Sequence, residues 1–176
     1  MFNIFKRKKK DDGKISTISI STAATFVIRS NLDELKEKWP TMKDEILNYE
    51  DIFADIDEER VQYEFMLAAM GADILALFNL FPKTQADKLF NELLKLLGES
   101  AGKIFVDAVN DYYSVAMDAV NKTKHPFDYI ASLLLHRLDV PESECGPLTM
   151  MGTTSAVSQM IGQWKWLHTS FTVAAS

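Results

Sequence analysis

The residues best suited to catalysis in this chain are three histidines and one cysteine, His125, His136, His168 and Cys145. No histidine has a second histidine or a cysteine at the spacing of a metal site, and no phosphate-binding or nucleophile motif is present. Di-metal helical bundles use paired Glu-x-x-His motifs, which this chain lacks. We therefore predict no catalytic, cofactor-binding or metal-ligating residues. The alternative is a helical enzyme whose site is assembled from distant residues.

Two carboxylates and the cysteine could still titrate unusually. Asp73 and Glu64 fall in an otherwise apolar stretch, where burial would raise the pKa of a carboxyl and mark a pocket. The alternative is that each side chain reaches the edge of the fold or caps a neighbouring helix. Cys145 follows Glu144, whose negative charge raises the pKa of a thiol, so we do not expect an activated nucleophile.

An acidic stretch is the first candidate for binding. Residues 33–64 contain 12 carboxylates and four basic side chains, a net charge of −8. We predict that this stretch docks a basic partner, as in an acidic inhibitor or an immunity-type protein; the alternative is a solvated helix face. Trp166 lies off the apolar face of its helix, so it either belongs to a contact surface or packs under the N-terminal residues. The candidate partner-binding residues are Asp55, Asp57, Glu58, Glu59 and Trp166.

The N-terminal residues have the opposite charge. Residues 1–14 contain six cations and two carboxylates, a net charge of +4, whereas the rest of the chain has a net charge of −10, which disfavours nucleic-acid binding by the body. We predict a reversible membrane tether, because each cation near an anionic surface contributes about 1 kcal/mol and two or three inserted apolar side chains add about 2–3 kcal/mol. The alternatives are a nuclear-localisation cluster, a weak nucleic-acid contact or a solvated start. The tether residues are Phe2, Ile4, Phe5, Lys6, Arg7, Lys8, Lys9 and Lys10.

The surroundings of this basic cluster indicate a cytoplasmic protein. The stretch that follows it, ISTISISTAATFVI, is too rich in Ser and Thr for a secretory signal. No apolar run has both the length and the composition of a transmembrane span. A lone cysteine fits a reducing compartment. We expect the tether to act at the inner face of the membrane.

Helical periodicity predicts the elements that position these residues. Residues 1–20 are rich in Lys, Asp, Ser and Thr and have no evident partner strand, so we predict a flexible tail without regular structure. The first helix is predicted from Ser21 or Thr22, with Ser30 as an alternative start. It is predicted to end at Trp39, because Pro40 disfavours helical geometry in the residue before it.

Residues 42–81 have apolar side chains in steps of three and four, which predicts one long helix or two. Asp55 and Asp57 followed by Glu58 and Glu59 favour a break at 55–57. From Phe65 onward the stretch is apolar on nearly every side, which is typical of a central helix enclosed by others.

The second half of the chain predicts four more helices. The first covers 85–97, with a capping box at Thr84 and Gly98 at its end, and the second runs from Ser100 or Ala101 to residue 121. Pro126 opens a helix over 127–137. A loop over 140–147 precedes a last helix over 148–171.

Length and composition complete the prediction. The chain has 176 residues, is 47% hydrophobic, and contains few glycines and prolines, which suits one helical domain with a real core. We predict an all-α, single-domain bundle of about six or seven helices over 21–176, preceded by the flexible basic tail of residues 1–20. The predicted function is that of a non-enzymatic binding or accessory protein with an unidentified protein partner; self-association stays open.

Overall fold

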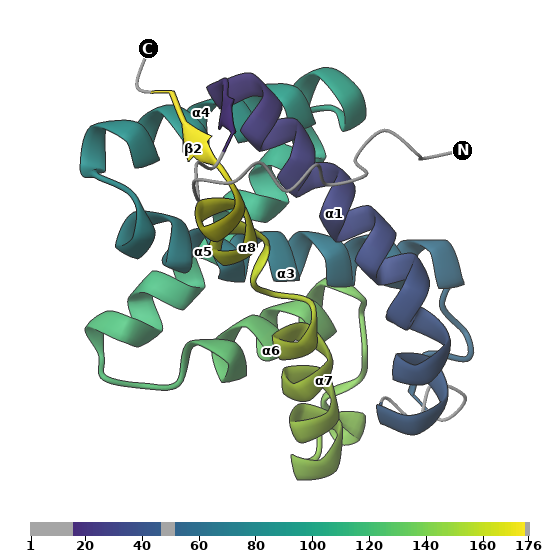
Figure 1. Ribbon diagram of the computed structural model, residues 1–176. Coiled ribbons are helices and arrows are strands. Elements are labelled where there is room, and N and C mark those ends of the chain that lie inside the picture. Colours follow the sequence, from purple (N-terminus) through teal and green to yellow (C-terminus); the bar gives the residue numbers. More distant parts are fainter. Residues whose placement is uncertain (1–15, 47–51, 175–176) are drawn as a thin grey trace.

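The chain folds into a bundle of helices around one central helix, as the sequence predicts. The computed structural model describes residues 16–46 and 52–174. Seven α-helices lie in this described part of the chain, so the predicted all-α class is confirmed (Figure 1). Its elements are β1 (Thr17–Ile18), α1 (Ile20–Thr41), η1 (Met42–Ile46), α3 (Glu58–Leu80), α4 (Lys83–Ala101), α5 (Lys103–Asn121), α6 (Pro126–Arg137), η2 (Glu142–Glu144), α7 (Pro147–Gln159), α8 (Gln163–Ser170) and β2 (Thr172–Val173).

Helix α3 runs through the middle of the molecule and contacts α1 and each helix from α4 to α8 (Figure 1). Every residue over 65–74 is buried, which explains why this stretch is apolar on nearly all sides. Gly71 lets α5 approach closely, since a Cβ on this glycine would lie 2.4 Å from the Cβ of Tyr112. The predicted break at 55–57 is confirmed, because the side chain of Asp57 accepts from the Arg60 amide and caps α3.

Helix α1 differs from its prediction at both ends. It begins at Ile20, and Ser19 caps it by accepting a hydrogen bond from the Thr22 amide at 3.0 Å, so the alternative start at Ser30 is wrong. It continues through Pro40 and passes into the π-helical turn η1. Trp39 is buried and its ring meets Phe65 edge-on at 6.1 Å. This tertiary contact outweighs the local effect of the proline, which lies only one residue from the end of the helix.

The predicted coil at the end of the tail is wrong at Thr17 and Ile18. These residues form β1, which pairs in parallel with β2 through Thr17↔Thr172 and Ile18↔Val173. The two strands lie side by side at the top of Figure 1. The sequence could not indicate this partner, because it lies at the far end of the described chain.

Three helix boundaries in the second half also need correction. Helix α4 starts after Pro82 rather than at a Thr84 capping box, and it continues past Gly98 to end before Gly102, whose φ is +86°. The predicted last helix is two helices, because Gly162 adopts a φ of +118° between α7 and α8. Only glycine adopts such angles without strain, so Gly102 and Gly162 mark the true breaks. Helices α5 and α6 lie within a few residues of their predicted ranges.

A groove between α3 and α5 as candidate functional site

A hollow of about 290 Å³ lies between the first turns of α3 and the start of α5. Its rim carries both carboxylates and apolar side chains, and its floor is a network of ion pairs. We refer to it as the α3–α5 groove. It is lined by Asp57, Glu59, Arg60, Tyr63, Glu64, Leu67, Ile104, Phe105 and Arg137.

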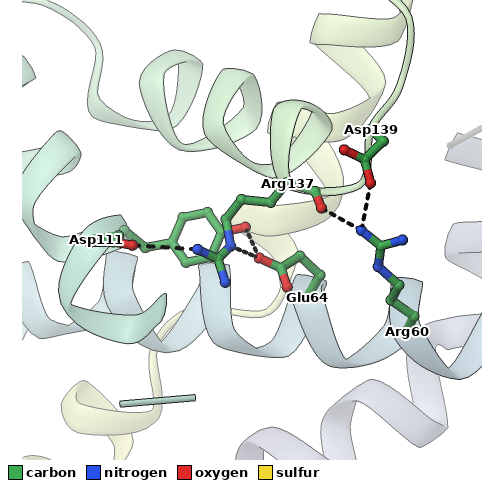
Figure 2. Close-up of polar contacts among 6 residues, drawn as sticks. Arg60, Glu64, Asp111, Arg137 and Asp139 are labelled. Carbon is green, nitrogen blue, oxygen red and sulfur yellow. Dashed lines mark hydrogen bonds and ion pairs between the residues drawn. The ribbon is translucent and has the colours of Figure 1, made fainter. Parts of the chain in front are cut away.

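The floor is built around Arg137, at the end of α6 (Figure 2). Its Nε donates to the Glu64 carboxylate, and its Nη1 lies 3.4 Å from Asp111 Oδ2 on α5. The Tyr112 hydroxyl donates to the same Glu64 oxygen at 2.6 Å, and burial, followed by the charge of Glu64, raises the pKa of Tyr112 far above its ordinary value. Arg137 therefore pairs with both carboxylates of the floor and joins α3, α5 and α6 to one another.

Arg60 closes one side of the groove. Its Nη2 donates to the carbonyl oxygen of Arg137 at 2.7 Å and to Asp139 Oδ2 at 3.0 Å (Figure 2). The carbonyl oxygens at the end of α6 lack partners inside the helix, and Arg60 satisfies one of them. Glu64 lines this pocket, as the sequence suggested for a carboxylate in the apolar stretch, but its bonds to Arg137 and Tyr112 give it a structural role.

The rim has two exposed apolar side chains with no role in the core. The Ile104 side chain is 77% exposed and Tyr63 is 46% exposed. The Tyr63 ring meets Phe105 edge-on at a centroid distance of 6.0 Å, which fixes one wall of the groove. Such neighbouring apolar groups, when they are surrounded by charges, are typical of contact surfaces.

Two exposed carboxylates lie near these apolar groups. Glu59 lines the groove on the α3 side, and Asp107 follows Ile104 by one turn of α5; in the described chain neither side-chain carboxylate makes a hydrogen bond or ion pair. Ile104, Asp107 and Asp111 recur at steps of three and four, so they share one face of α5. The face is therefore acidic with an apolar residue at its head.

The predicted partner-binding acids have different roles in the structure. Asp57 caps α3 and also lines the groove, and Glu59 lies on its rim. Glu58 accepts from Trp39 Nε1 at 2.6 Å and from Lys43 Nζ at 2.9 Å. The bond from Lys43, and then that from Trp39, lowers the pKa of Glu58, so this side chain is part of the fold. Asp55 is exposed and lies outside the groove.

Trp166 lies on α8 and does not line the groove. Its side chain is 44% exposed, and its ring meets Phe171 edge-on at 5.8 Å. The tether residues Phe2, Ile4 and Phe5, together with residues 6–10, lie outside the described residues, so the structure places neither them nor any packing of Trp166 under them.

Asp73 caps a neighbouring helix, as the alternative interpretation of the sequence proposed. Its Oδ1 accepts from the Gly162 amide at 2.9 Å and its Oδ2 from the Trp164 amide at 3.0 Å. The carboxylate therefore holds the start of α8, which carries the positive end of the helix dipole. Burial, with the charge of Glu34 as a smaller cause, raises the pKa of Asp73, and the backbone N–H groups of Trp164, Gly162 and Gln163 oppose that shift.

The candidate catalytic residues do not converge in the described part of the chain. His136 and Asp128 both line a second hollow of about 440 Å³ between α5 and α6, but they lie eight residues apart on one helix, a rise of about 12 Å. His168 packs edge-on against Phe81 at 5.0 Å. Burial, with Glu142 and Glu144 as further causes, raises the pKa of Cys145, in agreement with the expectation of an unreactive thiol. No group of three metal-ligating side chains occurs among the residues described.

No known family model, curated protein or solved structure significantly matches this chain. Helix α3 is long and apolar enough to cross a membrane, but 72% of its most apolar window is buried inside the fold, as in the core helix of a bundle. The function must therefore be argued from the groove itself.

Sequence reasoning missed the apolar half of the groove. Ile104 stands at the head of a stripe that continues as Asp107, Asp111, Ser114 and Asp118, and this off-face isoleucine was the available signal. Tyr63 fits the apolar three-and-four spacing of residues 42–81, so its position in the sequence predicts a buried side chain. The end of α3 that carries Tyr63 is covered on fewer sides than its middle, and the sequence does not contain this information.

Proposed function

We propose that this protein is a non-enzymatic binding protein that docks a basic segment of a partner protein in the α3–α5 groove. The observation that carries the proposal is that exposed Ile104 and Tyr63 line one hollow with the carboxylate of Glu59, while exposed Asp107 follows Ile104 by one turn of α5. A segment with an apolar side chain followed by Lys or Arg would match both features.

The magnitudes are adequate for a specific but reversible contact. Burying one large apolar side chain contributes about 1.5–3 kcal/mol, and Ile104 and Tyr63 offer two such side chains. Acidic groups at the rim would mainly raise the association rate and select a basic partner. The rigid floor of paired charges keeps the groove in shape, so little ordering is needed when a partner binds.

Photo-crosslinking from one position of α5 tests this proposal. A photoreactive residue at Ile104 should capture a partner in its native lysate, whereas the same residue at Val120, which is 47% exposed at the other end of α5, should not. The captured segment should contain Lys or Arg beside an apolar residue. Equal capture from both positions, or capture of an acidic segment, would contradict the proposal.

A pair of charge variants separates the groove from the acidic stretch as a whole. Glu59→Gln should reduce the crosslink at Ile104, because it removes a rim carboxylate. Glu37→Gln removes an exposed carboxylate of the same 33–64 stretch on α1 and should have no effect. If the partner loses an enzymatic activity on binding, the protein is an inhibitor of the immunity type, which uses the same surface.

The second candidate function is the membrane tether, which the sequence of residues 2–10 supports. At the start of α1, a hollow lined by Ser19, Ile20 and Ser21 also contains Lys88 and Lys95 of α4, and Glu92 of the same hollow pairs with Lys95 at 3.6 Å. The cationic contribution to the tether therefore comes from residues 6–10 rather than from α4. The proposed location is the cytoplasm, with reversible attachment to the inner face of the membrane.

A further inference from the structure

We propose that Phe2, Ile4 and Phe5 of this same chain occupy the α3–α5 groove when neither a partner nor a membrane holds them, while residues 6–10 lead away past its acidic rim. This N-terminal segment has the chemistry that the groove selects. Phe2, Ile4 and Phe5 precede five consecutive cations. The groove offers apolar Ile104 and Tyr63 beside acidic Glu59.

The position of β1 brings the segment within reach. The Ser16 carbonyl accepts from the Thr172 amide at 3.1 Å, and the neighbouring Val173 carbonyl accepts from Gln85 Nε2 at 2.7 Å. Ser16, the first described residue, therefore lies near the start of α4. From Gln85 to Ala101, α4 is about 24 Å long at its helical rise, and Ile104 follows directly in α5. Residues 6–15 span up to about 33–36 Å when extended.

Charge favours this occupant over a neutral peptide. Residues 1–14 have a net charge of +4, and the rest of the chain has a net charge of −10. Glu59 and Asp107 have no ion pair within the described chain, so the cations would neutralise charges that the fold leaves exposed to solvent. Attachment through a short linker gives an effective concentration of about 1 mM, so even a weak intrinsic affinity suffices.

When the N-terminal segment occupies the groove, it competes with partner binding in the groove and with its own binding to a membrane. The apolar side chains of residues 2–5 cannot lie in the groove and in a membrane interface at once. A partner with the same chemistry must displace the segment, so its apparent affinity is lowered by the fraction of chains that are open. Vesicle binding and partner binding should therefore each assist the other.

Paramagnetic relaxation enhancement in the full chain tests the proposal. A spin label at Asn3→Cys, in a Cys145→Ser background, should cause loss of the amide signals of Tyr63, Ile104 and Phe105 but not of Val120. The same label in a chain with Glu59→Lys and Ile104→Asp should leave the signals at positions 63 and 105 intact. Equal amide signals at Tyr63 and Val120, in the spin-labelled chain whose groove residues are unchanged, would overturn the proposal.

A mixed sample distinguishes the same chain from a second copy. Isotope-labelled chain without the spin label is mixed with spin-labelled chain of natural isotopic abundance. Under the proposal this sample shows no signal loss in the groove. Loss in the mixed sample alone would overturn it in favour of an exchange between two copies.

A synthetic peptide of residues 1–10 gives an independent measurement. It should bind a full chain carrying Phe2→Ser, Ile4→Ser and Phe5→Ser roughly tenfold more tightly than it binds the wild-type chain, whose groove is already occupied. Equal affinity for the two chains would overturn the proposal.

This proposal rests on the proposed function only because both use the same groove. The experiments can refute either proposal without refuting the other. Capture from Ile104 without signal loss in the spin-labelled chain leaves the partner site and removes the intramolecular contact. Signal loss without any capture from Ile104 leaves the intramolecular contact and removes the partner site.

Discussion

Asp73 is the residue on which the junction of α7 and α8 depends. Asp73→Ala should destabilise the fold by about 1–3 kcal/mol at low pH, because it leaves the Gly162 and Trp164 N–H groups without their acceptor. Burial raises the pKa of Asp73, so the folded state binds a proton more tightly than the unfolded state. The contribution of Asp73 to stability is thus fully present below the ordinary carboxyl pKa and falls as pH rises through the raised one. Urea unfolding across this range should show a penalty of Asp73→Ala that shrinks with pH, whereas exposed Glu37→Gln changes little. A penalty that grows with pH would show that the backbone bonds outweigh burial.

For single residues, the sequence predicted the local role of a side chain better than its hydrogen-bond and ion-pair partners. Asp57 as a helix cap and the unreactive Cys145 follow from neighbours in the chain. The partners of Asp73 and Glu64 come from helices that lie far away in the sequence, so no local pattern contains them. The sequence predicts the acidic part of the groove rim, because its carboxylates form a charge cluster along the chain. It does not predict the apolar part, because those residues lie on separate helices.

At the scale of elements, the crossing of α3 and α5 depends on Gly71. Gly71→Ala should destabilise the protein by about 1–3 kcal/mol through overpacking, although alanine is the better helix former by about 1 kcal/mol. A Cβ there would lie 2.4 Å from Tyr112 Cβ and 3.0 Å from the Val109 carbonyl oxygen, so the two helices must move apart. Gly98→Ala is the matched control, because its Cβ would meet only Val106 Cγ2 at 3.4 Å, and it should be neutral or stabilising. Thermal unfolding of both variants measures this, and equal stabilisation would show that the crossing tolerates a wider spacing.

The boundaries that the sequence missed share a physical cause. Pro40 and Gly98 look like helix ends, but packing carries α1 and α4 past them. Gly102 and Gly162 end helices because their φ angles are positive, a conformation that periodicity alone does not indicate. Periodicity predicted the existence and order of the helices, since each must bury one apolar face.

At the scale of the whole molecule, the tether predicts sedimentation of the full chain with vesicles that contain phosphatidylserine and not with purely zwitterionic ones. Binding should weaken from low to physiological salt, because the cationic contribution is screened. Phe2→Ala with Phe5→Ala should weaken it at unchanged charge. Deleting residues 1–10 should abolish it while the helical circular-dichroism spectrum stays unchanged, because the buried residues of the described chain begin at Ala23. Sedimentation of the truncated chain equal to that of the full chain would contradict the tether.

The pairing of β1 with β2 also has a consequence for synthesis of the chain. Thr17 and Ile18 leave the ribosome before every helix described here, and Thr172 and Val173 leave it after all of them. Strand β1 therefore stays unpaired until β2 has been synthesised after the last helix, whereas α1 to α7 can assemble before that point. Until Thr172 and Val173 have been synthesised, the chain therefore lacks the backbone hydrogen bonds that hold Ser16 and Ile18 against the C-terminal strand, so this contact is the last of the fold to form.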